Sequence, residues 1–349
     1  MTAIRHLVPQ AIRRGAAVQL ARLQAARLQR ELATLASGSH RIVAGPWLGE
    51  VGFELLYWVP FLAWFAEHYR VAPERLVIVS RGGVRPWYRP LATDYRELFD
   101  VLSPEEFRRC HDARVAAIGE QKQTRILDVE RDLLRRLDID ARDRVLHPSS
   151  MYRLFSPFWW GHVDESWVHR FTRYRRLQHV TEDAVTLPGP FPGAPRDRGG
   201  YTAVKFYFSD SFPATDENRA FVRQVLATLT ARGRVVSLTT GLHLDDHGDD
   251  PGGSGADVPG VEPLPAGVDP RINLALQSAI VAGATTLVGT YGGFSYLAPF
   301  YGVTSIAYYD ADRFSPRHLT MVRSALATLG IGHLLDVRYA RQAALQTPA

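Results

Sequence analysis

Residues 285–309 have the sequence TTLVGTYGGFSYLAPFYGVTSIAYY, and this stretch decides the fold. Two apolar, β-branched runs, 285–290 and 304–309, have the composition of buried strands. The segment between them is long enough for one short helix and begins near the adjacent glycines Gly292 and Gly293. Strand, glycine turn, helix and strand form a βαβ unit, which predicts a parallel sheet. In a parallel sheet, ligands bind beyond the carboxyl ends of the strands, where this turn falls.

The residues before this unit continue the alternation of strands and helices. Thr215 or Asp216 is a suitable N-cap for the first expected helix, and Gly233 follows its last turn. Residues 201–349 are therefore expected to form a Rossmann-like C-terminal domain. Its further expected strands are 201–208, 234–240 and 260–264, and its further expected helices are 215–233 and 269–284.

The first half of the chain shows the same alternation. A glycine-containing turn over 45–52 separates an expected strand from an apolar, aromatic helix. The segment 144–160 is rich in aromatic and turn-forming residues, which indicates a strand end followed by a long loop. The expected strands are 41–44, 75–80 and 114–119, and the expected helices are 54–69 and 125–137.

Residues 187–200 divide these two halves. This stretch contains four prolines and four glycines, which neither a helix nor a central strand accommodates. The predicted fold class is α/β, with two Rossmann-like domains and a cleft between them, preceded by a helix. The predicted divisions are a basic helix over 1–38, an N-terminal acceptor domain over 39–186, a linker over 187–200 and a nucleotide-sugar domain over 201–349.

The positive charge is concentrated at the N-terminus. The chain carries a net charge of +5, and residues 1–41 hold seven arginines and one acid, Glu31. The rest is close to neutral, so a DNA-binding core is not indicated. The basic amphipathic segment favours either a surface anchor on anionic lipid or a helix packed on the protein itself. The apolar run 55–66 is too short to span a bilayer. The single cysteine, Cys110, fits a cytoplasmic protein, and the basic helix would place it at the inner face of the membrane.

The order of elements over 201–310 resembles the donor-binding half of GT-B glycosyltransferases, particularly the heptosyltransferase type. The segment YLAPFYGVTSI corresponds to an HLAxxxGxPTI-like segment of that family, with Tyr296 at a position where the family often has histidine. The resemblance implies a transferase that binds the diphosphate of a nucleotide-sugar at the glycine turn. It implies an inverting reaction with no cofactor, and no metal where positive groups hold the leaving diphosphate.

The predicted donor site gathers at the ends of the C-terminal strands. Lys205, one of only two lysines, would offset phosphate charge, and the helix after the glycine turn would offer free N–H groups. Glu262 would accept from a ribose hydroxyl, or it is a solvated loop acid. Ser209, and with it Ser211, would reach phosphate. The full predicted set is Lys205, Ser209, Glu262, Thr290, Tyr291, Gly292, Gly293 and Ser295.

The predicted catalytic residues lie in the first half. An inverting transferase needs a general base that accepts the proton of the acceptor hydroxyl. Glu50, in the glycine-rich stretch GPWLGEVGFE, is the first candidate, with Glu54 second and His147 third. For Glu50 the alternative is capping of the following helix, since a carboxylate also stabilises a helix N-terminus.

Two further segments have less specific patterns. Residues 167–176 interleave aromatic side chains with arginines, which suits an acceptor that carries phosphate or a lipid diphosphate, or else a solvated helix face. Residues 241–257 collect histidines and aspartates without the spacing of a known metal-binding loop, which favours a mobile acidic loop.

The expected partners are a nucleotide-sugar donor and a glycan or lipid-linked acceptor, without nucleic acid. Two other functions fit the same sequence. A sugar-nucleotide epimerase would use the donor site without an acceptor. A non-catalytic binding or scaffold protein would use the glycine turn for packing alone.

Overall fold

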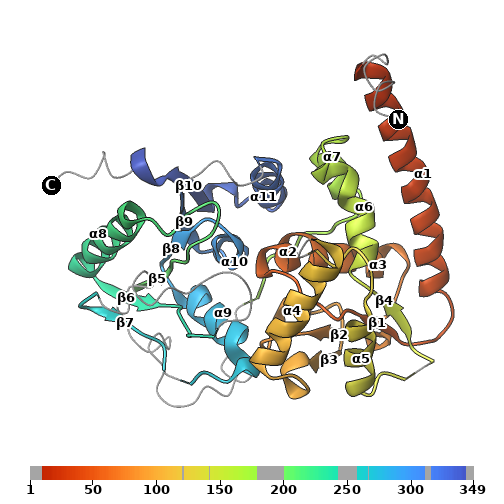
Figure 1. Ribbon diagram of the computed structural model, residues 1–349, viewed down its shortest axis with the longest axis horizontal. Helices are drawn as coiled ribbons and strands as arrows, with labels where there is room; N and C mark the ends of the chain where they lie inside the picture. The colour runs from red at the N-terminus through yellow and green to blue at the C-terminus, as the bar shows by residue number, and fades with distance from the viewer. Residues whose placement is uncertain are drawn as a thin grey trace.

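The computed structural model describes residues 10–119, 122–140, 142–178, 200–242, 258–265, 267–310 and 316–342. These residues form two parallel sheets, each with its own helices, and a long N-terminal helix (Figure 1). The predicted fold class is therefore confirmed. Nearly all of the predicted linker and the histidine- and aspartate-rich part of 241–257 lie outside the described residues.

The N-terminal sheet has the order β3-β2-β1-β4, with every pair parallel. Val43 at its centre lies beside Val77 on one side and Val145 on the other, and these buried or half-buried strands need the apolar composition seen in the sequence. The strands are β1 (Ile42–Ala44), β2 (Leu76–Ser80), β3 (Asp94–Glu97) and β4 (Arg144–Leu146), and the helices are α2 (Val51–Phe53), η2 (Glu54–Trp58), α3 (Val59–His68), α4 (Pro104–Ile118), α5 (Asp128–Arg136), α6 (Ser149–Trp159) and α7 (Glu165–His169).

The C-terminal sheet has six parallel strands in the order β10-β9-β8-β5-β6-β7. Counted from its first strand, β5, this is the 3-2-1-4-5-6 order of a doubly wound Rossmann sheet. Thr215 caps the N-terminus of α8, because its side chain accepts a hydrogen bond from the Asn218 N–H. The strands are β5 (Tyr201–Lys205), β6 (Arg234–Ser237), β7 (Val261–Glu262), β8 (Thr286–Thr290), β9 (Thr304–Tyr309) and β10 (Leu335–Tyr339), and the helices are α8 (Asp216–Arg232), α9 (Asn273–Gly283), α10 (Gly293–Phe300) and α11 (Pro316–Thr328).

The N-terminal helix α1 (Gln10–Ala36) packs on the protein's own N-terminal domain, along α6 (Figure 1). Its buried face carries small and aliphatic side chains three or four residues apart, the spacing of one helix face. Arg75 and Arg144 donate hydrogen bonds to carbonyls of its last turn, which have no partners within the helix. The buried residues are Ala21, Ala25, Leu28, Leu32 and Ala36.

The strand predicted at 114–119 is wrong, because these residues end helix α4. Ser103 and Glu106 form a capping box at the start of this helix, and Gly119 ends it in the left-handed conformation. The third strand of the sheet is instead β3, with the sequence DYRE. It is an edge strand with three of its four residues at least partly exposed, so it lacks the apolar run that marks a buried strand.

The long loop predicted within 144–160 is also wrong, because residues 149–159 form α6. Pro157 lies inside this helix and has no N–H to donate to the carbonyl of Arg153. The hydroxyl of Ser156 donates to that carbonyl instead, at 3.1 Å. The carbonyl thus keeps a partner, and the helix continues through the proline.

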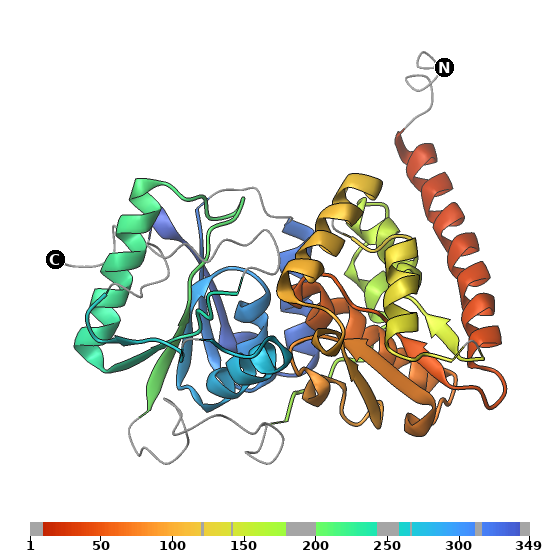
Figure 2. The same cartoon turned by 60° about the horizontal axis from the view of Figure 1, so that its bottom comes forward.

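The two domains meet through helices, and each domain contributes some of them. In Figure 2, α9 and α10 lie between the C-terminal sheet and the N-terminal domain, while α8 covers the opposite face of the sheet. One hydrophobic cluster joins both halves, and Trp87 of the N-terminal domain donates through its indole N–H to Ser278 of α9. We call the contact region of α2, η2 and α3 with α9, α10 and α11 the seam.

Candidate active site at the domain seam

Lys205 lies where the order in which strands are added to the C-terminal sheet reverses. Strands β5 and β8 are neighbours, although α8, β6, β7 and α9 separate them along the chain. The sheet is built outward in both directions from this pair, which makes it the topological switch point, the usual ligand site of such a sheet. Lys205 is paired with Gly289, so the end of β5 and the glycine turn leave the sheet side by side.

Two glycines of this turn lie where the surrounding atoms leave no room for a side chain. A Cβ on Gly289 would lie 2.0 Å from the carbonyl oxygen of Lys205, and one on Gly292 would lie 1.7 Å from the hydroxyl oxygen of Tyr207. Both distances are far below van der Waals contact. These glycines therefore bring the end of β5 and the residues after it against the turn.

The third glycine, Gly293, joins the two domains. A Cβ on Gly293 would lie 2.6 Å from the backbone nitrogen of Gly52 and 3.0 Å from its Cα. Helix α10 begins at Gly293, and the helical run of α2, η2 and α3 begins at Val51. Two helix N-termini therefore meet backbone to backbone at the seam, and both direct the positive ends of their dipoles there.

The hydroxyl groups predicted to contact a ligand are used inside the turn. Thr290 Oγ1 donates to the carbonyl of Tyr207 and accepts from its N–H. Ser295 Oγ donates to the carbonyl of Gly292 and accepts from its N–H. Tyr291 is buried, and burial raises the pKa of its hydroxyl to about 12. Thr290 and Ser295 therefore hold the turn in shape.

The predicted phosphate partners have different surroundings. Lys205 is buried, and its Nζ lies 5.6 Å from the ring centroid of Phe294, in the first turn of α10. Its charge therefore lies close to that helix N-terminus. Ser209 and Ser211 contact each other through their hydroxyls at 3.0 Å, and the carbonyl of Ser211 accepts from the N–H of Asp310, just after β9. All of them lie at the carboxyl edge of the sheet.

Glu262 does not fit the predicted ribose contact. Both of its carboxylate oxygens accept hydrogen bonds from Arg234, at 2.8 and 2.9 Å. Arg234 begins β6, so this ion pair draws the carboxylate toward the edge opposite the strand ends. An ion pair between the two neighbouring strands is the role that this geometry supports.

Glu50 lies directly at the domain contact. It is the N-cap residue of α2, but its side chain makes no capping hydrogen bond. A hydrogen-bonded side-chain cap is therefore absent, while the alternative of a carboxylate that stabilises the helix dipole needs no such bond and stays open. Glu50 is half-buried and lies two residues before Gly52. Among the candidate bases, Glu50 is the one placed at the seam with some exposure to solvent.

Three side chains hold the loop that carries Glu50. Gln123 donates to the carbonyl of Pro46 and accepts from the N–H of Leu48. Arg114 donates to the carbonyl of Leu48, and Arg81 to that of Gly49. These contacts come from three separate segments, so the position of the loop depends on the folded domain rather than on its own sequence.

Glu54 has a structural environment. Its side chain is fully buried, and its oxygens accept from Ser80 and Tyr88 at 2.5 Å each and from Arg81 at 3.1 Å. Burial raises the pKa of Glu54, although Arg81 and the hydrogen bonds oppose the shift. The carboxylate ties the helix to the end of β2.

His147 also has a structural environment. It is buried after β4, where its Nδ1 accepts from the N–H of Ser149 at 3.1 Å. Its Nε2 lies 3.4 Å from a carboxylate oxygen of Glu130. Burial raises the pKa of Glu130, but the contacts with His147, Leu127 and Gln123 lower it by more. This buried cluster supports the loop that carries Glu50 and does not face the seam.

An aromatic wall that the sequence did not indicate completes the seam. His318 of α11 lies against Phe53, Tyr57 and Tyr296, with ring centroids 5.3–5.6 Å apart. Its Nδ1 is 3.1 Å from the hydroxyl of Tyr57. Burial, and then the positive charge of Lys122, lowers the pKa of His318 to about 4. These contacts bring α11 of the C-terminal domain against the start of the helical run α2–η2 in the N-terminal domain.

The depressed pKa of His318 predicts a stability that depends on pH. An unfolded histidine titrates near 6.5, so this contribution is complete above that pH and is lost as pH falls toward 4. At pH 5 we expect a loss of about 2 kcal/mol relative to pH 7. Urea unfolding of the wild type and of His318→Phe at both pH values measures it. The variant should lose less stability between the two, and equal losses would contradict the assignment.

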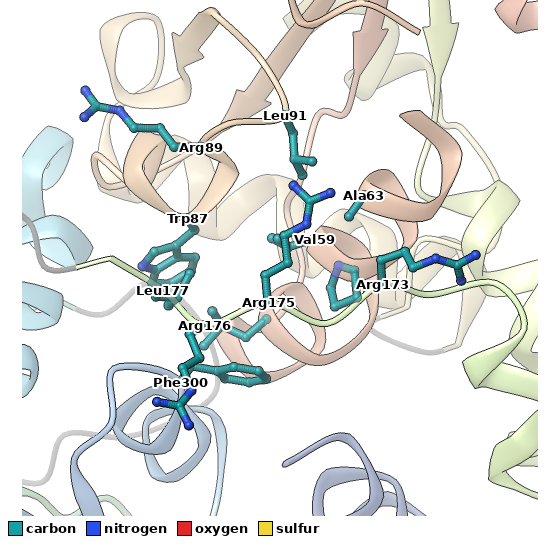
Figure 3. Close-up of a pocket in the computed structure, with 12 residues that line it drawn as sticks. Val59, Ala63, Trp87, Arg89, Leu91, Arg173, Arg175, Arg176, Leu177 and Phe300 are labelled. Atoms are coloured by element: carbon teal, nitrogen blue, oxygen red, sulfur yellow. The ribbon is translucent and has the colours of Figure 1, made fainter. Parts of the chain in front are cut away.

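A separate hollow lies beside the segment 172–177, which leaves the N-terminal domain. Val59, Ala63 and Phe300 are among its apolar lining, and arginines surround it (Figure 3). Figure 3 shows the side chain of Arg175 running across the apolar part toward Leu91. In the stretch 167–176, helix α7 ends at His169, and three of the four arginines of the stretch line this hollow. They are Arg173, Arg175 and Arg176.

Among the described residues, no group of three or more histidine, cysteine, aspartate or glutamate side chains could hold a metal ion. In the same part of the chain, no helix combines the length and the apolar character that crossing a membrane requires.

No protein-family model and no curated protein matches the chain. Solved structures similar to it include E. coli heptosyltransferase WaaC with ADP, at 13% identity and a TM-score of 0.46, covering 88% of this chain and 98% of that one. E. coli ADP-heptose lps heptosyltransferase II has 10% identity and a TM-score of 0.37, covering 84% and 100%. The dodecameric glycosyltransferase TibC from E. coli has 13% and 0.41, covering 80% and 62%. Values this low carry no argument about activity, which rests on the site itself.

Proposed function

We propose that the protein is a glycosyltransferase that moves a sugar from a nucleotide-sugar donor to a glycan or lipid-linked acceptor. One observation carries the proposal. The switch point of the C-terminal sheet carries Lys205 and the glycine turn. This turn touches the other domain next to Glu50, the N-cap residue of α2. Two helix N-termini thus meet where the two domains touch, Lys205 lies close to one of them, and Glu50 directly precedes the other.

The donor diphosphate is assigned to the start of α10. The first N–H groups of a helix have no partners within it, and they point outward with the positive end of the dipole. Lys205 adds a full positive charge over the first turn of the same helix. This arrangement stabilises the negative charge that develops on the leaving diphosphate, which is what a reaction without metal requires.

Glu50 is assigned the role of general base. Its carboxylate accepts the proton of the acceptor hydroxyl while that oxygen forms a bond to the anomeric carbon. The bond from this carbon to the diphosphate breaks, and the nucleoside diphosphate leaves with the electron pair. Attack from the face opposite the diphosphate inverts the anomeric configuration.

Thermal unfolding against UDP-, GDP-, ADP-, CMP- and dTDP-linked sugars tests the donor site. Binding to the folded state raises the transition midpoint by mass action. We expect one nucleotide class to raise it, and Lys205→Ala to weaken that affinity about 10- to 100-fold, because a charge-assisted contact is lost. Lys122→Ala is the matched control, since it removes the other lysine and should keep donor affinity.

Two results would contradict the proposal. No shift with any of the five nucleotide classes would remove the donor site. Equal affinity in Lys205→Ala and the wild type would place the donor elsewhere. In either case the glycine turn would be a packing feature only.

Contact of α1 with a membrane is a second part of the proposal. Leu20 and Leu23 are more than half exposed on this helix, and Arg22 and Arg27 lie exposed beside them. Apolar and basic side chains together favour an anionic lipid surface. Cosedimentation with vesicles containing phosphatidylglycerol should fall in Leu20→Glu/Leu23→Glu, and unchanged cosedimentation would exclude this face.

A further inference from the structure

The two lysines of the chain, Lys122 and Lys205, occupy corresponding places on the two sides of the seam. Gly52 and Gly293 touch there, and each is followed by a phenylalanine. Nζ of Lys205 lies 5.6 Å from the ring centroid of Phe294. Nζ of Lys122 lies 5.9 Å from the ring centroid of Phe53. Each domain thus places one ammonium group beside its own helix start. The donor accounts for Lys205 and leaves Lys122 without a role.

Lys122 is held by aromatic rings rather than by an acid. Besides Phe53, its Nζ lies 5.3 Å from the ring centroid of Trp159, and the two ring centroids are 5.7 Å apart. Throughout the described residues it has no carboxylate partner. Ring faces attract a cation without cancelling its charge. The half-buried ammonium therefore keeps its capacity for an anion.

The wall around Lys122 suits the face of a sugar. Phe53 and Trp159 are both partly exposed, and His318 stacks on Phe53 with a centroid distance of 5.3 Å. Burial, and then the charge of Lys122, lowers the pKa of His318, which keeps this ring neutral at pH 7. The aromatic rings suit the apolar face of a sugar ring, and the neighbouring cation suits an acidic group on that sugar.

We propose that Phe53, Trp159 and Lys122 form the acceptor subsite and that it takes a sugar bearing a carboxylate or a phosphate. The acidic group contacts Lys122, and the sugar ring lies against the aromatic side chains. Phe53 is three residues after Glu50, on the first turn of the same helix, so the subsite places an acceptor hydroxyl on the side of the base. This inference rests on the proposed transferase function and gives its acceptor a chemical class.

Two lysines in a chain make a direct test possible. Reductive methylation with ¹³C-formaldehyde labels both lysines and the α-amino group while keeping their charge. The Lys122→Arg and Lys205→Arg variants assign the two side-chain signals. D-glucuronate and glucose 6-phosphate are expected to move the Lys122 signal in a saturable manner, and D-glucose is expected to leave it in place.

Matched tryptophan variants separate this subsite from a general surface effect. Trp159→Ala should raise the half-saturating concentration of D-glucuronate about tenfold, which corresponds to the loss of a stacking contact of about 1.4 kcal/mol. Its neighbour Trp160 is 77% exposed, and Trp160→Ala should leave that concentration unchanged.

Three outcomes would overturn the inference. The Lys122 signal stays in place with both acidic sugars, or D-glucose moves it equally, or inorganic phosphate alone moves it at the same concentration. Nucleotide-sugars act on the Lys205 signal in the same spectra. Failure of the donor site is therefore read separately from failure of the acceptor subsite.

Discussion

Replacing Gly293 with valine is expected to weaken donor binding and slow transfer by about 100-fold while both domains remain folded. A Cβ at this position would lie 2.6 Å from the backbone nitrogen of Gly52, and backbone atoms cannot rotate away as a flexible side chain can. The starts of α2 and α10 must therefore separate, which displaces the diphosphate site relative to the other domain. A displacement of about 1 Å costs roughly 100-fold in a positioned site. Donor affinity and transfer rate measure the effect.

A glycine without neighbours provides the control for this substitution. A Cβ on Gly233, after α8, would meet no atom within 4 Å, and its backbone is extended. Gly233→Val should keep donor affinity. Circular dichroism of Gly293→Val should match the wild type. If Gly293→Val binds donor as tightly as the wild type, the contact with Gly52 does not define the site.

Replacing Glu54 with alanine is expected to destabilise the protein by about 3–5 kcal/mol, because it leaves a buried charge without its partner. Arg81 is almost fully buried and pairs with Glu54 at 3.1 Å, and Ser80 and Tyr88 also lose their acceptor. Urea unfolding of Glu54→Ala measures the loss. Adding Arg81→Ala should cost less than the sum of the two single changes, since the unpaired charge is then absent.

Glu67 on the same helical run is the matched control. It pairs with Arg173 at 2.9 Å, but both side chains are about half exposed. Exposed ion pairs contribute roughly 0–1 kcal/mol, so Glu67→Ala should have a small effect. Equal losses for Glu54→Ala and Glu67→Ala would contradict the structural role assigned to Glu54.

The candidate site was partly predictable from the sequence. Strand ends and glycine turns follow from local patterns, which is why Lys205 and the turn at 289–293 were found. The role of each hydroxyl was not predictable, because Thr290 and Ser295 bond to backbone groups whose positions depend on the turn itself. Glu54 and Glu50 are four residues apart in the sequence, and the contacts of Glu54 with Ser80, Arg81 and Tyr88 separate their environments.

By itself the sequence determined the class of fold and the place of the glycine turn at the carboxyl edge of the C-terminal sheet. Alternating apolar runs, caps and glycines are local signals, and they fix helices and strands with little help from distant residues. These signals did not predict the edge strand β3 or the helix α6. The polar strand β3 forms by pairing with the rest of the sheet, and α6 continues through Pro157 because Ser156 bonds the carbonyl that the proline cannot. The tertiary structure alone decided that Gly52 meets Gly293, that Phe53 and Trp159 hold Lys122, and that His318 reaches the first domain. Each of these contacts joins residues distant in the chain, and the packing of two folded domains sets their distance.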